Sequence, residues 1–385
     1  MALMTASLSK SRQAVVLGAG ISGMTAARLL AHSGWEVEVA GPVPTSTRWV
    51  TLSARTVQLI NDIWDSDIVT AATHYRLASR RVIWDTDAAA EVLEPLVALE
   101  SSSLAATMLE KFSREHLGSV SSGSTLSAQE PTPARSAQFV IDARGRNSNF
   151  PRRYSGRRQM RVWEPISIDH GAAEFAEMHA GIGYWCFLFP LGSKQLCLQI
   201  ATPEPEISGT LSEKIKNDAS DHSLLAKLVE KVPDLFDLAT SVIPIAPSFH
   251  TQPIRASRLP VGDALMTLDP LCGDGVGHGV KSAILAVAVA NSAAVTVSTE
   301  DALKHFELRT TRAFASHLKH CRGYYSKIRH AAPWEGEVES IAQAMEKLTT
   351  SNRDEGSTLL VLEDPDAGHS AKNVCHVKRP YLKQA

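Results

Sequence analysis

The feature that most constrains this chain is the stretch VVLGAGISGMTAARLL at residues 15–30. Its glycines Gly18, Gly20 and Gly23 have the spacing G-x-G-x-x-G, between an apolar run and a run with helical periodicity. Residues 34–39, GWEVEV, are typical of a second strand. In such a unit the first glycine permits a tight turn, the second lets the backbone approach a pyrophosphate, and the third lets helix and strand pack closely. The pattern therefore predicts a Rossmann-like, nucleotide-binding start.

One side chain expected in such a unit is missing. An acidic residue usually ends the second strand and binds the adenosine ribose, and here Gly41 occupies that position. The next basic residue is Arg48, so a 2′-phosphate is not indicated either. The helix start still offers unpaired N–H groups to phosphates.

A second glycine-rich stretch, VGDALMTLDPLCGDGVGHGV at residues 261–280, narrows the choice of nucleotide. Asp263 follows a predicted strand, where its carboxylate can accept a ribitol or ribose hydroxyl. The glycines that follow open a second helix, whose N–H groups can stabilise negative charge on a ring system. Two glycine-rich helix starts about 240 residues apart suggest a long ligand held at both ends. FAD fits this better than NAD.

These motifs together resemble those of the FAD-dependent aromatic hydroxylases (class A flavoprotein monooxygenases) and the related tryptophan halogenases. The matching segments are the first glycine motif, the arginine-bearing RWVTLSARTVQLI, the Gly-Asp pair at 262–263 and a P-x-x-G-x-G motif from Pro270. The resemblance implies that the cofactor-binding residues are Gly18, Gly20, Ser22, Gly23, Arg48, Asp263, Gly273, Gly275 and Val276.

The fold class that follows is α/β: a Rossmann-like FAD-binding domain with an inserted β-sheet substrate domain (the aromatic hydroxylase fold) and C-terminal helices. Alternating aromatic segments such as YWCFLFPLGSKQLCLQI predict the inserted antiparallel strands. The predicted boundaries are an FAD domain in two parts, a substrate domain between them, and a helical region with a tail. The FAD domain comprises residues 1–160 and 258–300, the substrate domain residues 161–257, and the helical region with its tail residues 301–385.

The resemblance implies hydroxylation of an aromatic ring through a flavin C4a-hydroperoxide, with O2 and an external electron donor as co-reactants. Two departures narrow the subgroup. Ala143-Arg144-Gly145 replaces the Ala-Asp-Gly motif associated with NADPH use, which puts direct reduction by NADPH in doubt. Only RVWEPISI, with the single Trp163, stands where halogenases carry W-x-W-x-I-P, which disfavours a halogenase.

A third subgroup is more similar. GYWCFLFPLGSKQLCLQIAT and HFELRTTRAFASHLKHCRGYYSKIRHAAPW resemble segments of the flavoproteins of tryptophylquinone cofactor biogenesis, which hydroxylate a tryptophan in a partner polypeptide. The expected partner is therefore an aromatic substrate, with a tryptophan-containing protein as the finer hypothesis. Three alternatives stay open: a hydroxylase or halogenase of a free small aromatic, a flavin-dependent double-bond reductase, and a non-catalytic FAD-binding assembly factor.

The candidate substrate pocket consists of Trp163, Trp185 and Phe187, although alternating aromatics are also typical of ordinary sheet core. His278, inside the second glycine-rich loop, is the candidate general base. Asp269 and Pro270 of the same loop complete the predicted catalytic group, with helix capping and turn formation as the alternative role for the aspartate.

Seven arginines lie within 18 residues in RGRNSNFPRRYSGRRQMR. They predict either a solvated loop or a docking surface for an acidic partner or anionic substrate. The seven residues are Arg144, Arg146, Arg152, Arg153, Arg157, Arg158 and Arg161.

Composition excludes several other classes. The 385 residues carry a net charge of -2, which gives no reason to expect a nucleic-acid partner. No apolar run reaches the length of a membrane span, and the first residues lack the apolar core of a signal peptide. The five cysteines are scattered, odd in number and without C-x-x-C, which favours the cytoplasm and argues against a metal site.

Overall fold

The computed structural model describes residues 12–121 and 137–354, with gaps at residues 43, 46–47, 85–88, 172, 204–212, 217–222, 253, 294–297 and 329–331. The chain divides into two compact units, of which the first ends at Met345. The described part of the second unit is the end of helix α10 (Glu335–Asp354). The sheets, the other helices and the candidate site belong to the first unit, and the predicted tail lies outside the described residues.

A parallel sheet forms the nucleotide-binding layer that the first glycine motif predicts. Its order is β18-β9-β1-β2-β8, and every neighbouring pair is parallel. The strands are β1 (Gln13–Leu17), β2 (Glu36–Ala40), β8 (Ser119–Ser121), β9 (Phe139–Asp142) and β18 (Arg258–Pro260). Strand β18 follows the segment 161–257 in the sequence but pairs with β9, which precedes that segment. The parallel sheet therefore contains residues from both sides of the segment. The domain boundaries themselves stay a prediction.

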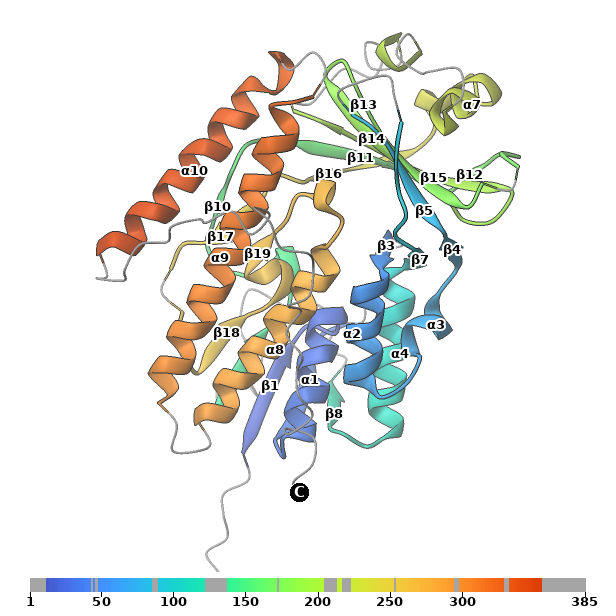
Figure 1. Cartoon of the computed structure of the whole chain (residues 1–385). Coiled ribbons are helices and arrows are strands. Elements are labelled where there is room, and N and C mark those ends of the chain that lie inside the picture. Colours follow the sequence, from blue (N-terminus) through green and yellow to red (C-terminus); the bar gives the residue numbers. More distant parts are fainter. Residues whose placement is uncertain are drawn as a thin grey trace, which may run out of the picture. The chain divides into compact units, whose positions relative to one another are not determined.

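Helices cover this sheet. Helix α1 (Ile21–His32) packs against α8 (Gly275–Ala293), and α8 packs against the long helix α9 (Thr299–Tyr325) (Figure 1). Small residues let α1 and α8 approach closely: a Cβ added at Gly279 would lie 2.4 Å from Ser22 Oγ. The neighbouring helices are α2 (Ala54–Trp64), α3 (Ile68–Ala72) and α4 (Ser101–Arg114).

The second layer is a β-rich sheet of order β16-β11-β15-β14-β13-β5-β6, with β12 also pairing β15. Its ladders are antiparallel except that of β13 with β5. The strands are β5 (Ser79–Ile83), β6 (Ala90–Val92), β11 (Gln159–Trp163), β12 (Ile166–Ser167), β13 (Phe175–Gly181), β14 (Tyr184–Pro190), β15 (Gln195–Thr202) and β16 (Thr240–Pro244). Strands β5 and β6 precede residue 161, so this sheet also gathers residues from the first part of the chain.

The two faces of the β-rich sheet have different partners. The outer face packs its apolar side chains against α7 (Leu224–Lys231). The inner face packs Phe189 and Cys197 against a small antiparallel sheet of order β3-β7-β4. These strands are β3 (Trp49–Ser53), β4 (Tyr75–Leu77) and β7 (Leu96–Glu100).

The remaining elements connect the layers. A third small sheet has the order β10-β17-β19, and short 3-10 turns end several strands. Its strands are β10 (Arg152–Tyr154), β17 (Ser248–His250) and β19 (Met266–Thr267). The 3-10 turns are η1 (Gly145–Asn147), η2 (Leu235–Asp237), η3 (Gly262–Ala264), η4 (Pro270–Cys272) and η5 (Ala332–Trp334). No helix in the described ranges has the length and apolarity needed to cross a bilayer.

Candidate functional site

The turn between β1 and α1 has the geometry that its three glycines predict. Gly18 has φ +104°, and a Cβ there would lie 2.6 Å from the Ala143 carbonyl oxygen. A Cβ at Gly23 would lie 2.0 Å from the Gly18 carbonyl oxygen. Around Gly20, by contrast, an added Cβ would meet nothing within 4 Å. The outer two glycines are therefore required by packing, whereas the middle one leaves open space at the start of α1.

Three charged side chains from distant segments gather near this turn. Asp263 in η3 forms an ion pair with Arg146 in η1, with 3.4 Å between Oδ2 and Nε. Arg48, just before β3, interacts electrostatically with both of them. The Asp263 side chain stays 38% exposed. It can therefore still accept a hydrogen bond from a ligand hydroxyl.

The second glycine-rich loop leads into α8. Gly273 has φ +64°, and Gly275, the first residue of α8, is exposed, with nothing within 4 Å of an added Cβ. Val276 is partly exposed in the same helical turn. The start of α8 therefore presents backbone N–H groups to open space, as the start of α1 does.

Asp274 fixes this loop from one side. Its carboxylate accepts hydrogen bonds from Thr56 Oγ1 at 3.1 Å and from Lys281 Nζ at 2.9 Å. Burial alone would raise the pKa of Asp274, but the hydrogen bond from His278 and the charge of Lys281 lower it to about 2. His278 Nδ1 lies 3.1 Å from the carboxylate and 3.0 Å from the Asp274 carbonyl oxygen. The candidate base is thus tied to its own helical turn, and its catalytic role stays a prediction.

The two open helix starts fit a dinucleotide. Gly20 and Gly275 leave room for close approach to α1 and α8, both of which direct positive dipole ends into that space. Arg48 and Asp263 supply a cation for phosphate and an acceptor for hydroxyls. Ser22 Oγ lies 2.7 Å from a Cβ position at Gly262, next to Asp263, and its role as a ligand stays a prediction.

One cross-strand row on the inner face of the β-rich sheet is incompletely covered. Its members are opposite one another in register, and all except the buried Met178 are partly exposed. The row, which we call the inner strip, consists of Val162, Gln199, Phe187, Met178 and Val82. The flanking rows are buried, with Trp185 1% and Phe189 0% exposed. The inner strip is therefore a partly exposed row on a face that is otherwise mostly buried and apolar.

Two contacts connect the inner face of the β-rich sheet with the candidate cofactor site. Gln199 Nε2 donates to the Trp49 carbonyl oxygen at 3.4 Å, one residue after Arg48. Arg80, on the same face of β5, has its Nη1 3.6 Å from a Cβ position at Gly273. The second glycine-rich loop at Gly273 therefore lies near the face of the sheet to which Phe187 belongs.

The three predicted pocket aromatics do not share one face. Trp163 belongs to the outer cluster against α7, and its Nε1 donates to the Leu235 carbonyl oxygen at 2.9 Å. Trp185 is buried on the inner face, where its Nε1 donates to Tyr325 Oη at 3.1 Å. Strand alternation causes the separation, because neighbouring residues of a strand point to opposite faces. Phe187 alone of the three is partly exposed.

Asp269 lies in a buried polar network that the sequence did not reveal. Arg158 Nε and Tyr325 Oη each donate to its Oδ2 at 2.8 Å, and Arg158 also pairs with Glu337. The side chains of Arg158 and Asp269 are 0% exposed. Burial alone would lower the pKa of Arg158, but Asp269 raises it above the ordinary value. Asp269 has no open surface here, so its observed role is to fix the loop that begins at Pro270.

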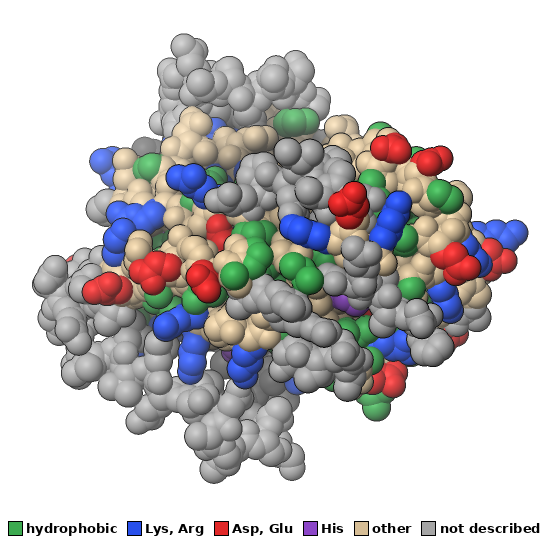
Figure 2. Space-filling view, turned by 90° about the horizontal axis from the view of Figure 1, so that it is seen from above, with side chains coloured by type: hydrophobic (Ala, Val, Ile, Leu, Met, Phe, Trp, Pro, Cys, Tyr) green, Lys and Arg blue, Asp and Glu red, His purple; other side chains and the backbone are tan. Residues whose placement is uncertain are grey.

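The arginine-rich segment is not one basic surface. Arg144 is 4% exposed and pairs with the buried Asp142, while Arg158 and Arg146 form the ion pairs described above. Arg152 donates to the Gly145 carbonyl oxygen at 2.8 Å. Part of this charge is thus neutralised inside the protein, whereas Arg153 and Arg157 are exposed, and a docking surface stays a prediction. Figure 2 likewise shows acidic and basic side chains interspersed on the described part of one face.

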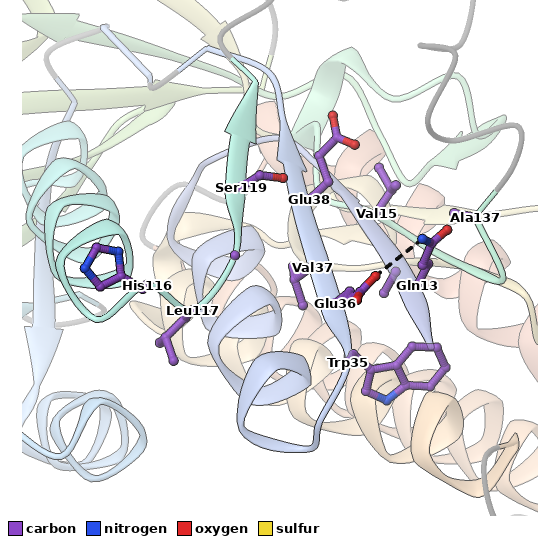
Figure 3. Close-up of a pocket in the computed structure, with 12 residues that line it drawn as sticks. Gln13, Val15, Trp35, Glu36, Val37, Glu38, His116, Leu117, Ser119 and Ala137 are labelled. Carbon is purple, nitrogen blue, oxygen red and sulfur yellow. Dashed lines mark hydrogen bonds between the residues drawn. The ribbon is translucent and has the colours of Figure 1, made fainter. Parts of the chain in front are cut away.

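A surface groove lies elsewhere (Figure 3). It is lined by residues at the amino-terminal ends of β1 and β2, among them Gln13, Trp35 and Glu36. Ligands of parallel α/β sheets bind outside the carboxyl ends of the strands, where Gly18 lies. The groove is therefore at the wrong end of the sheet for the candidate site.

Comparisons with known proteins agree with this geometry at the level of the fold. The sequence matches no protein-family model and no curated protein. Many solved structures are similar in fold. A peptidyl tryptophan dihydroxylase, QhpG, essential for tryptophylquinone cofactor biogenesis, has a TM-score of 0.63 at 17% identity, over 85% of this chain and 78% of that one.

The myxobacterial FAD-dependent halogenase CndH has a TM-score of 0.68 at 16% identity, over 91% of both chains. PqsL, a probable FAD-dependent monooxygenase from Pseudomonas aeruginosa, has a TM-score of 0.65 at 16% identity, over 88% of this chain and 100% of that one. This chain has the fold of FAD-dependent monooxygenases and halogenases. The predicted fold class is thereby confirmed.

Proposed function

We propose that this chain is an FAD-dependent monooxygenase that oxidises an aromatic ring. Two observations carry the proposal. The starts of two helices, at Gly20 and Gly275, are open, and a partly exposed row, the inner strip, lies on the sheet face whose Arg80 approaches Gly273. A long dinucleotide reaches both helix starts, and an aromatic ring fits against the mostly apolar inner strip. This arrangement favours flavin chemistry over a purely structural role for the glycines.

The residues divide into cofactor-binding and substrate-binding roles. The start of α1 at Gly20 binds the pyrophosphate, and Arg48 and Asp263 bind a phosphate oxygen and a ribityl hydroxyl. The start of α8, from Gly273 to Val276, stabilises negative charge on the flavin ring. Reduced FAD supplies the activation of O2. The chain's own tasks are to orient the ring and to exclude water.

The inner strip binds the substrate. Phe187 offers an aromatic face for stacking, and Val162 and Val82 offer aliphatic contact. Gln199 is the polar residue of the strip, and its amide can orient a hydroxyl or an indole N–H. A mostly apolar row with one amide suits an uncharged, electron-rich ring.

A tryptophan side chain of a partner polypeptide is the finer substrate that we propose. Two observations support it: the resemblance of two segments to the flavoproteins of tryptophylquinone biogenesis, and the similarity of fold to a peptidyl tryptophan dihydroxylase. The cysteine usage favours the cytoplasm as the place of reaction. Arg144, in place of the family aspartate, is turned inward to Asp142. We therefore expect electrons from a separate donor rather than from directly bound NADPH.

Halogenation is the second candidate, because the halogenase CndH matches this fold over 91% of both chains. Trp163, the tryptophan nearest to a halogenase motif, lies on the outer face of the sheet, away from the inner strip. That position disfavours a role in halogenation.

The test starts with full-length chain loaded with FAD and an external reductant under air. Proteins that co-purify with the chain, and separately free tryptophan and indole, are incubated with and without chloride and bromide. Intact-mass analysis that shows one or two added oxygen atoms on a tryptophan of a partner supports the full proposal. Oxygen added only to free tryptophan or indole supports an aromatic-ring monooxygenase but not the tryptophan of a partner polypeptide as its substrate. Halide-dependent products, or flavin turnover without any oxygenated product, contradict both.

A further inference from the structure

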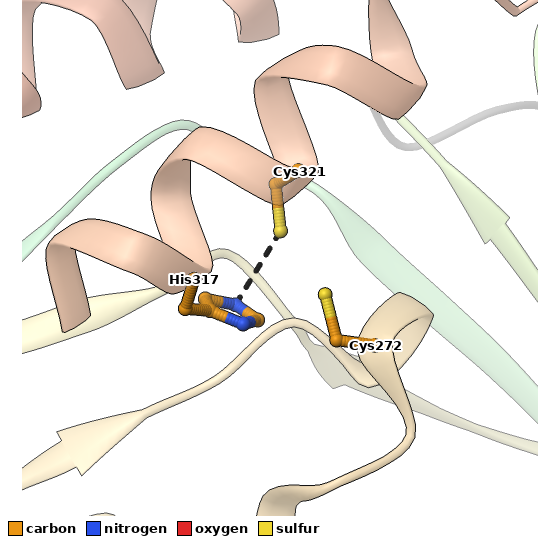
Figure 4. A group of neighbouring side chains, drawn as sticks. All are labelled: Cys272, His317 and Cys321. Carbon is orange, nitrogen blue, oxygen red and sulfur yellow. Dashed lines mark hydrogen bonds between the residues drawn. The ribbon is translucent and has the colours of Figure 1, made fainter. Parts of the chain in front are cut away.

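Three soft ligand groups meet beside the second glycine-rich loop. Cys272 Sγ, His317 Nε2 and Cys321 Sγ all lie within 4.8 Å of one another (Figure 4). His317 and Cys321 are four residues apart on α9, which places them on one face of the helix. Cys272 approaches from η4. The three residues share no short sequence motif, and only the four-residue spacing of His317 and Cys321 is visible along the chain.

The histidine has a neutral tautomer whose Nε2 can act as a metal ligand. The Asp269 backbone N–H donates to His317 Nε2 at 2.8 Å, so Nε2 carries the lone pair and Nδ1 carries the proton. Cys321 Sγ lies 3.4 Å from the same nitrogen. A metal ion would take over this lone pair from the Asp269 amide. The lost hydrogen bond is weak compared with the metal–ligand bonds gained.

The distance between Cys321 and His317 matches a tetrahedral zinc site. Zinc bonds of about 2.3 Å to sulfur and about 2.0 Å to nitrogen at tetrahedral angles put sulfur and nitrogen about 3.5 Å apart. The observed separation between Cys321 Sγ and His317 Nε2 is 3.4 Å. The same geometry puts two sulfurs about 3.8 Å apart, within the 4.8 Å limit of this group.

Charge selects among the soft metals. Cys321 and His317 are buried, at 0% and 4% exposed, so an uncompensated charge would be costly. Two thiolates and one neutral imidazole neutralise Zn²⁺, whereas Cu⁺ would leave one negative charge. The nearby Arg158 is already paired with Asp269 and Glu337. A neutral zinc centre is therefore the best match.

We propose that Cys272, His317 and Cys321 bind one Zn²⁺ ion. Binding forms two Zn–S bonds and one Zn–N bond, and two thiol protons pass to solvent. No fourth His, Cys, Asp or Glu in the described residues joins the group, so a water molecule completes the tetrahedron. The ion ties η4 to α9 and thereby fixes the loop that precedes the open start of α8. It acts as a structural clamp for that loop.

The test uses the full-length chain, reduced and stripped of metal with a chelator. Zn²⁺ is titrated in competition with a chromophoric chelator, and Co²⁺ is bound in parallel as a spectroscopic probe. We expect one zinc per chain, a thiolate-to-cobalt charge-transfer band and the intense d–d bands of tetrahedral cobalt. Cys272→Ser and His317→Gln each lower zinc affinity by at least about 100-fold, more than loss of an outer-shell partner does.

The control variants distinguish the loss of a zinc ligand from the loss of the folded structure. His317→Gln keeps an acceptor for the Asp269 amide, and Cys197→Ala removes a buried thiol outside the group without affecting zinc affinity. Circular dichroism checks that each variant folds, and the wild-type cobalt spectrum decides the matter even if one does not. Substoichiometric zinc with an octahedral cobalt spectrum overturns the proposal. A reduced chain that takes up no zinc, but forms a Cys272–Cys321 disulfide in air, also overturns it.

Discussion

The contrast between two glycines of the first motif gives the sharpest prediction. Gly20→Ala places a methyl group in space that is empty in this structure, at the N-cap of α1 with φ -75° and ψ 175°. Alanine adopts this extended conformation without strain. Reduced freedom of the unfolded chain stabilises by about 0.4–1 kcal/mol, and the poorer N-cap costs about 0.5–1 kcal/mol. The unfolding free energy of the apo-protein should therefore change by less than about 1 kcal/mol.

FAD binding should respond very differently to Gly20→Ala. The methyl group stands where the pyrophosphate must approach, and it removes at least one charge-assisted hydrogen bond, worth about 1.5–3 kcal/mol. The Kd for FAD should rise roughly 10- to 150-fold. Gly23→Ala behaves in the opposite way, because its Cβ would lie 2.0 Å from the Gly18 carbonyl oxygen. Relieving that contact requires a backbone shift and costs at least about 1–3 kcal/mol of stability.

The assay pairs urea denaturation of the apo-variants with FAD titration followed by flavin fluorescence. The reasoning is refuted if Gly20→Ala binds FAD as tightly as the wild type. It is equally refuted if Gly23→Ala is as stable as the wild type.

Three further predictions concern the buried network and the sheet faces. Arg158→Met leaves the buried carboxylate of Asp269 without its cation and should cost about 3–5 kcal/mol in urea denaturation; an unchanged midpoint would contradict the network. Phe187→Ala should raise the KM for an aromatic substrate and cost less stability than Trp163→Ala, which should cost about 3–5 kcal/mol; steady-state kinetics and thermal melts would reveal the opposite order. Burial raises the pKa of Glu177 above its ordinary 4.5, so its stabilising contribution is complete below pH 4.5 and is lost as pH rises through the higher folded value. Glu177→Gln should therefore gain stability relative to the wild type on going from pH 4.5 to neutral, and parallel denaturation curves at all pH values would argue against this.

The parallel sheet could be predicted because its signals are local. The spacing of Gly18, Gly20 and Gly23 encodes a turn, and the apolar runs on either side encode buried parallel strands. The pairing of β18 with β9 was anticipated only in outline, through the second glycine-rich stretch. Local backbone chemistry thus sufficed for the layer that holds the two helix starts.

The substrate-binding face of the sheet was harder to predict, because the register of the strands decides which face each side chain occupies. Trp163 and Trp185 are similar residues in similar alternating strands, yet cross-strand pairing places them on opposite faces. The arginine series was hard to interpret for a related reason. Arg144 pairs with a buried carboxylate, and Arg158 pairs with a carboxylate far away in the sequence. A count of charges along the chain does not reveal such partners.

The group formed by Cys272, His317 and Cys321 depends on tertiary structure even more. Its members come from a 3-10 turn and a helix 45 residues further along the chain. Only the packing of α9 against η4 brings them together. The helical spacing of His317 and Cys321 was the one signal that the sequence offered, and two ligands on a helix do not specify a metal.

The most direct test of the central claim is oxygen incorporation by the FAD-loaded chain. Reduced enzyme is mixed with isotopically labelled O2 and with a tryptophan-containing protein that co-purifies with it, or with free indole where no such protein is found. The account predicts labelled oxygen on the aromatic ring, at a yield that Phe187→Ala lowers. A chain that binds no FAD, or that binds it and leaves every ring unlabelled, contradicts the account.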